Sequence, residues 1–250
     1  MSNSNLVSYT KISPNRNSPR NHAIDRISIH CVVGQCTAER IGEIFAPESR
    51  EASSNYGIGP DGRIGMYVEE KDRSWCTSSA ANDHRAVTIE VASDTAHPYA
   101  VKAAAFSALL DLCTDICKRN GKKRLLWFGD KEKTLAYTPK ADEMVLTVHR
   151  WFDNKACPGE YLYSRHGEIA AEVTKRLAEA GKPTAPAGTG DNPSAWAKTA
   201  TEYCKRKGIF SGVGAGNFDW QKPITREQVA AVIYRTLERA GLLEVLPDMK

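Results

Sequence analysis

Short apolar runs alternate with stretches of helical periodicity through the first 180 residues, and this alternation constrains the fold more than any other feature. The runs at 27–33, 86–92 and 124–128 have the length and composition of buried strands. Apolar residues recur at helical spacing within 101–120 and 161–180, and a glycine follows each of these two segments. Strands that alternate with helices predict an α/β layer structure.

A tight turn adds antiparallel pairing to this plan. The segments S-N-Y-G-I-G and R-I-G-M-Y-V lie on either side of Asp61-Gly62, a dipeptide that favours hairpins because glycine tolerates positive φ. We therefore expect a mixed central sheet flanked by helices.

The composition changes at residues 181–193, which read G-K-P-T-A-P-A-G-T-G-D-N-P. This segment is too rich in proline and glycine to form a helix or strand, so we interpret it as a linker. It separates a domain over 1–180 from a small, mainly helical module over 194–250. We expect one helix of the module over 194–207 and another from Thr225, where T-R-E-Q has the form of a capping box.

Charge and hydropathy exclude several classes of protein. The net charge of +4 and isoelectric point of about 8.6 fall short of the concentrated basic surface of a nucleic-acid binder. No segment approaches the roughly 18 apolar residues that span a bilayer, so we expect neither a nucleic-acid nor a membrane partner. The polar N-terminus lacks the apolar run of a signal peptide, which predicts a cytoplasmic origin. The seven cysteines are then expected to be mostly reduced.

Three residues have the chemistry of zinc ligands: His30, His149 and Cys157. Two imidazoles and one thiolate, with a fourth position left to water, are typical of a catalytic zinc site. Without the flanking motifs, these residues are also compatible with purely structural roles. A lone histidine within a strand is usually a hydrogen-bonded core residue, and C-P-G at 157–159 is compatible with a turn that carries a buried thiol.

The order of the motifs resembles one family. His30 is followed by N-Y, then I-E-V, then H-x7-C-P-G, which is similar to the zinc-dependent type-2 N-acetylmuramoyl-L-alanine amidases. That family includes phage lysins and peptidoglycan recognition proteins. S-S-N-Y-G-I-G-P-D-G-R-I-G and L-C-T-D-I-C-K-R-N-G look like phage and prophage endolysins, and the resemblance covers about residues 8–178. The chain departs from the family pattern at Cys31, where relatives often have a second histidine, and at Cys76, where many read W-H.

The resemblance implies a ligand set and a reaction. Matching motifs make His30, His149 and Cys157 the ligands of Zn²⁺. The implied reaction is hydrolysis, by zinc-activated water, of the amide bond between N-acetylmuramic acid and L-alanine in peptidoglycan.

Three further residues match the family's active site: Lys155, Tyr56 and Glu90. Glu90 would accept a proton and pass it to the leaving amine, while Lys155 and Tyr56 would stabilise the oxyanion. The relative importance of Glu90 and Tyr56 stays open, and Glu90 is also compatible with a solvent-facing strand position.

Several other residues have no assigned role. Trp75 and Trp151 are compatible with a sugar-binding cleft or with the core. His166 falls on the second predicted helix, where we expect it to be exposed or half-buried.

The C-terminal module resembles one S-layer homology repeat, through its Trp196 opening, G-I-F-S-G, G-N-F and I-T-R-E-Q. The resemblance implies binding to secondary wall polymers through Trp196, Arg226 and Glu227, although Arg226 and Glu227 are also compatible with a role at the helix start alone. Three repeats are the usual unit and only one is present. About 50 residues form little core alone, so self-association into a homo-oligomer is a hypothesis.

The leading interpretation is an endolysin, made in the bacterial host cytoplasm, that acts on the cell wall after release. A non-catalytic peptidoglycan-binding protein of the same fold is one alternative, although such proteins generally lack the cysteine ligand. A muropeptide-recycling amidase is another, but a recycling enzyme has no use for a wall-binding module.

Overall fold

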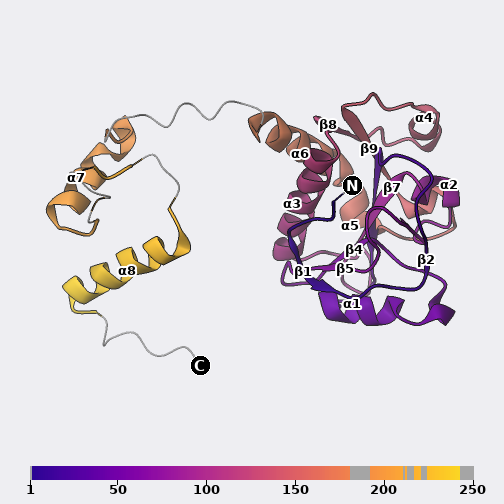
Figure 1. Ribbon diagram of the computed structural model, residues 1–250, viewed down its shortest axis with the longest axis horizontal. Coiled ribbons are helices and arrows are strands. Elements are labelled where there is room, and N and C mark those ends of the chain that lie inside the picture. Colours follow the sequence, from indigo (N-terminus) through magenta and orange to yellow (C-terminus); the bar gives the residue numbers. More distant parts are fainter. Residues whose placement is uncertain (1, 181–191, 211, 213–216, 221–223, 243–250) are drawn as a thin grey trace. The chain divides into compact units, whose positions relative to one another are not determined.

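The computed structural model describes residues 2–180, 192–210, 212, 217–220 and 224–242 (Figure 1). The chain divides into two compact units, residues 1–181 and 182–250. Most of the predicted linker, residues 181–191, lies outside the described residues.

The first unit contains a seven-stranded sheet in the order β1-β5-β4-β7-β3-β9-β8 and a two-stranded sheet of β2 and β6. In the larger sheet β4 and β5 pair antiparallel, and every other pairing is parallel. The strands are β1 Val7–Thr10, β2 Arg16–Asn17, β3 Arg26–Cys31, β4 Tyr56–Ile58, β5 Ile64–Met66, β6 Arg73–Ser74, β7 Ala86–Val91, β8 Arg124–Leu126 and β9 Glu143–Thr147. The mixed sheet and the hairpin are therefore confirmed.

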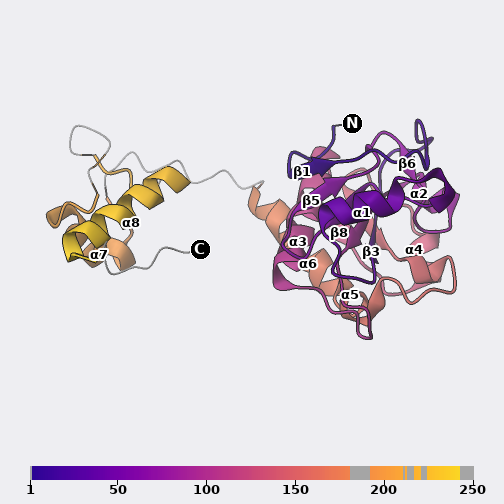
Figure 2. The same cartoon turned by 90° about the horizontal axis from the view of Figure 1, so that it is seen from below.

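Helices flank this sheet, as Figure 2 shows from a second direction. They are α1 Ala38–Phe45, α2 Ala80–Asp83, α3 Ala103–Arg119, α4 Lys131–Ala136, α5 Gly159–Tyr163 and α6 His166–Ala180, with short 3₁₀ helices η1 Glu48–Arg50 and η2 His149–Trp151. The single helix expected over 161–180 is divided between α5 and α6. α3 and α6 pack against each other, and their apolar residues join those of the strands in one core.

The central strand β3 separates apolar from polar side chains. Successive side chains of a strand point to opposite faces. Ile27 and Ile29 join the core that includes α3 and α6, whereas Ser28 and His30 are buried on the opposite face. In the register of the sheet His30 pairs with Glu90 of β7, and Glu90 pairs with Gly57 of β4. His30 and Glu90 therefore lie on the same, polar face.

His166 differs from our expectation. Its side chain is fully buried, its Nδ1 lies 2.7 Å from the carbonyl oxygen of Leu162, and its ring packs on Trp127. Trp127 also stacks on Trp151 with ring centroids 5.0 Å apart. Trp151 is thus part of the packed interior.

The second unit contains η3 Ala195–Ala197, α7 Lys198–Arg206 and α8 Arg226–Ala240. The capping box at Thr225 is formed: the Thr225 hydroxyl accepts from Gln228 N, and the Gln228 side chain accepts from Thr225 N. Among the described residues of this unit, none is fully buried.

Candidate metal centre and its pocket

A short loop brings His149 and Cys157 together. His149 begins η2 directly after β9. Two hydrogen bonds from Arg150 close the loop, since its backbone N donates to Cys157 O (3.2 Å) and its Nη2 donates to Ala156 O (2.8 Å). The H-x7-C spacing therefore places an imidazole and a thiol at the carboxyl end of β9, beside β3.

His30 completes a group of three donors. Its Nδ1 lies 3.2 Å from Cys157 Sγ, and its ring centroid lies 5.1 Å from that of His149. One donor atom from each of His30, His149 and Cys157 lies within 4.8 Å of the other two. Donors that share a tetrahedral zinc ion through bonds of about 2.0–2.3 Å lie about 3.5 Å apart, which is close to the 3.2 Å between His30 Nδ1 and Cys157 Sγ. The structure therefore brings the three predicted ligands together in an arrangement that fits zinc.

Burial keeps His30 in the form that binds metal. The ring is inaccessible to solvent, and desolvation, followed by the nearby His149, holds the pKa of His30 well below its usual value. Only neutral imidazole has a lone pair for a metal ion. Burial raises the pKa of the Cys157 thiol, and a bound cation would favour its thiolate instead.

Glu90 lies next to this group. Its Oε1 is 4.0 Å from His30 Nδ1 and 3.9 Å from Cys76 Sγ, while its Oε2 is buried without a hydrogen-bond partner among the described residues. Burial raises the pKa of Glu90 to about 8. The interpretation of Glu90 as a solvent-facing strand residue does not fit, because its side chain is only 14% exposed.

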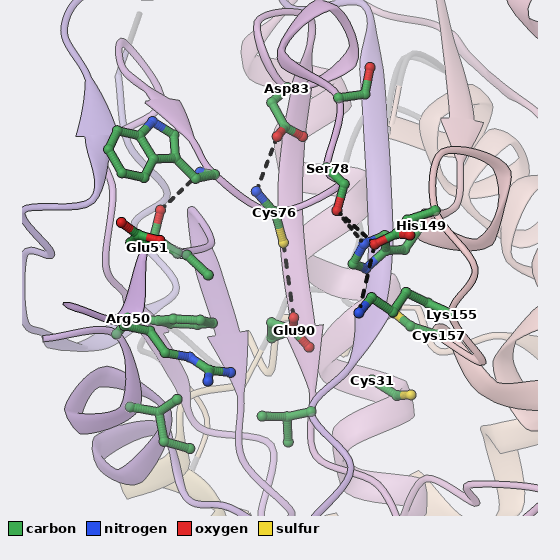
Figure 3. Close-up of a pocket in the computed structure, with 18 of the residues that line it drawn as sticks. Cys31, Arg50, Glu51, Cys76, Ser78, Asp83, Glu90, His149, Lys155 and Cys157 are labelled. Carbon is green, nitrogen blue, oxygen red and sulfur yellow. Dashed lines mark hydrogen bonds and ion pairs between the residues drawn. The ribbon is translucent and has the colours of Figure 1, made fainter. Parts of the chain in front are cut away.

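His149, Cys157 and Glu90 line a pocket of about 750 Å³ (Figure 3), and His30, which is inaccessible to solvent, contacts Cys157 in its wall. Lys155 lies on its wall with Nζ 3.7 Å from Asp153 Oδ2. Trp75 also lines the pocket. The side chains at the two departures from the family pattern, Cys31 and Cys76, lie in the same wall.

Tyr56 is not brought to this pocket. It pairs with Ile89, the residue before Glu90, so its side chain points to the opposite face of the sheet. Its hydroxyl donates to Glu70 Oε1 (2.7 Å) and accepts from Ser4 N (3.0 Å) in the interior. These partners give Tyr56 a structural role. Its hydroxyl lies away from the pocket, so we do not propose that it stabilises the oxyanion.

Two polar residues that our sequence analysis did not single out also lie in the pocket wall. Asp83 accepts hydrogen bonds from the backbone of Cys76 and from Thr77, and Ser78 contacts His149. Both residues lie in the run R-S-W-C-T-S-S-A-A-N-D-H at 73–84, but their residue types indicate no role there, because their contacts depend on how the turn before α2 packs against η2.

The amino-acid sequence matches two family models. The model described as N-acetylmuramoyl-L-alanine amidase (Amidase_2) matches residues 19–160, and that of the S-layer homology domain matches residues 191–230. No curated protein matches.

Solved structures of similar fold include three relatives of low identity. The endolysin N-acetylmuramoyl-L-alanine amidase LysCS from Clostridium intestinale is 18% identical, with TM-score 0.46 over 67% of this chain and 92% of that one. AmpD is 16% identical, with TM-score 0.48 over 68% and 99%. The Drosophila peptidoglycan recognition protein SA is 17% identical, with TM-score 0.44 over 61% and 81%. On the match over residues 19–160, which is more than half of its length, the chain belongs to the N-acetylmuramoyl-L-alanine amidase family.

Proposed function

We propose that this protein is a zinc-dependent amidase of the endolysin type that cleaves the bond between N-acetylmuramic acid and L-alanine. The observation that carries the proposal is the convergence of His30, His149 and Cys157 beside Glu90, at a pocket that His149, Cys157 and Glu90 line. Zinc bound by such a set acts as a Lewis acid and activates water at neutral pH.

The residues of the pocket have distinct roles in this proposal. Glu90, whose pKa of about 8 lies near neutral pH, accepts the proton of the attacking water and delivers it to the leaving amine. The Lys155 ammonium, on the pocket wall, stabilises negative charge on the carbonyl oxygen of the scissile amide.

Two other functions are less well supported. A protein that only binds peptidoglycan does not need the thiol at Cys157, which lies 3.2 Å from His30 Nδ1. A recycling amidase for soluble muropeptides does not need the S-layer homology unit.

Product analysis distinguishes these functions. Purified Gram-positive cell walls are incubated with the unaltered chain and with Cys157→Ser, and new alanine α-amino groups and new reducing sugar ends are counted. We expect the unaltered chain to release alanine amino groups without reducing ends, and the variant to release neither. Binding to walls without release would support the binding protein, and activity on soluble muropeptides alone would support the recycling enzyme.

The second unit is proposed to hold the protein to secondary wall polymers and to self-associate. Trp196 is 88% exposed, and Arg226 and Glu227 are exposed at the start of α8. The apolar residues Ile233 and Tyr234 of α8 are 54% and 53% exposed. A unit in which no described residue is fully buried gains a core when a second copy packs against it.

Among the described residues, no helix is both long and apolar enough to cross a membrane.

A further inference from the structure

The Ser78 hydroxyl connects His149 to a carboxylate. Ser78 Oγ lies 3.1 Å from His149 Nε2 (Figure 3). The same hydroxyl donates a hydrogen bond to Asp153 Oδ2 (3.3 Å). A hydroxyl has one hydrogen, and an ionised carboxylate can only accept. The hydroxyl hydrogen of Ser78 is therefore used in the hydrogen bond to Asp153. Toward the His149 ring, Ser78 Oγ can only accept a hydrogen bond.

The direction of these hydrogen bonds determines which nitrogen of His149 carries the proton. If Ser78 accepts from Nε2, that nitrogen carries the single proton of the neutral imidazole, and Nδ1 keeps its lone pair. We infer that Ser78, oriented by Asp153, is a positioning residue that fixes the tautomer and ring orientation of His149 so that Nδ1 faces the metal. The inference rests on the proposed zinc centre.

The turn that carries Ser78 is held firmly in place. Ser78 has φ 59°, a left-handed conformation that costs a residue with a side chain of this kind about 1 kcal/mol or more. Asp83, only 2% exposed, holds the preceding residues: its Oδ2 accepts from Cys76 N (3.1 Å) and its Oδ1 from Thr77 Oγ1 (2.6 Å). A serine kept in this conformation by a buried carboxylate, with its hydroxyl on a proposed ligand, fits a positioning role.

The backbone conformation permits a sharp test. Ser78→Gly removes the hydroxyl and relieves the left-handed backbone, whereas Ser78→Ala removes the hydroxyl and keeps the strain. Glu51→Gly is the matched control, because Glu51 has φ 50° and lines the same pocket without a contact to His149 among those described. Zinc affinity of the full chain is measured by competition with a chromophoric chelator, and the cobalt-substituted proteins are compared by their visible absorption.

We expect both Ser78 variants to bind zinc about 10- to 100-fold more weakly and to show an altered cobalt spectrum, while Glu51→Gly binds as the unaltered chain does. Unchanged affinity in Ser78→Gly would overturn the inference, whether or not Ser78→Ala is weakened, since the effect would then belong to the backbone. Failure of the unaltered chain to bind zinc would overturn the proposed function as well.

Discussion

Glu90 is the carboxylate in the pocket whose surroundings favour proton transfer near neutral pH. Replacement by glutamine keeps the shape of the side chain and removes its basicity. Because the three proposed ligands are untouched, we expect Glu90→Gln to bind zinc normally and to release alanine amino groups about 10²- to 10⁴-fold more slowly. Zinc content and initial rate on cell walls check this. A variant with bound zinc and the full rate would remove Glu90 from the mechanism.

His166 makes stability depend on pH. Burial lowers its pKa from 6.5 to about 4, so the unfolded chain binds a proton between these values and the folded chain does not. This difference lowers the free energy of unfolding as pH falls from 6.5 to 4, by about 3 kcal/mol at 1.36 kcal/mol per pH unit.

Urea unfolding of the unaltered chain and of His166→Leu, from pH 7 to pH 4, measures this contribution. We expect the variant to lose less stability over that range than the unaltered chain. Parallel pH profiles would show that His166 is not the group responsible.

Residues of the site differ in how far the sequence could predict them. His30, His149, Cys157, Glu90 and Lys155 stand in motifs, and all five line the pocket or lie at its donor group. Tyr56 also stands in a motif, but its face depends on whether it pairs with Ile89 or with Glu90. A shift of one residue in register reverses the face, and the sequence does not specify that register.

Among the elements of the first unit, Arg20 connects the segment at 70–72 with the segment at 84–86, which leads into β7. Its guanidinium donates to backbone carbonyls of residues Glu70 (2.7 Å), Asp72 (2.9 Å), His84 (2.9 Å) and Ala86 (3.1 Å), and the side chain is buried. A lysine ammonium cannot reproduce this planar set of donors. Buried carbonyls left without donors cost about 1–3 kcal/mol each.

We therefore expect Arg20→Lys to lower the free energy of unfolding by about 3 kcal/mol or more. Arg40→Lys is the matched control, because the Arg40 side chain is 62% exposed and forms an ion pair with Glu43 at the surface, and the loss of stability should stay under about 0.5 kcal/mol. Urea denaturation of both variants checks the difference. Equal effects would mean that the buried carbonyls find other donors.

Elements with clear periodicity were predictable, and those without it were not. The strand at 86–92 and the helix at 101–120 correspond to β7 Ala86–Val91 and α3 Ala103–Arg119. The sequence pattern does not predict β9 Glu143–Thr147, although this strand leads directly to His149. Five residues are too few for periodicity to separate a strand from a helix segment, and the strand order depends on pairings between distant residues.

At the scale of the whole molecule, the exposed apolar residues of α8 bear on assembly. Ile233 is 54% exposed, and burial of such side chains between copies would stabilise an oligomer. We expect the full chain to sediment as an oligomer in analytical ultracentrifugation. A charge at this position opposes burial, so Ile233→Lys should sediment as a monomer with its amidase rate on soluble substrate unchanged. A monomeric unaltered chain would contradict the self-association.

In the proposed function, one zinc ion held by His30, His149 and Cys157 is required for hydrolysis of the muramoyl–alanine bond. The most direct test removes metal with a chelator and then titrates zinc into the full chain while the release of alanine amino groups from cell walls is measured. We expect no release without metal, and a rise in release that saturates at one equivalent of zinc. Full release from the metal-free protein, or release that zinc does not restore, would contradict it.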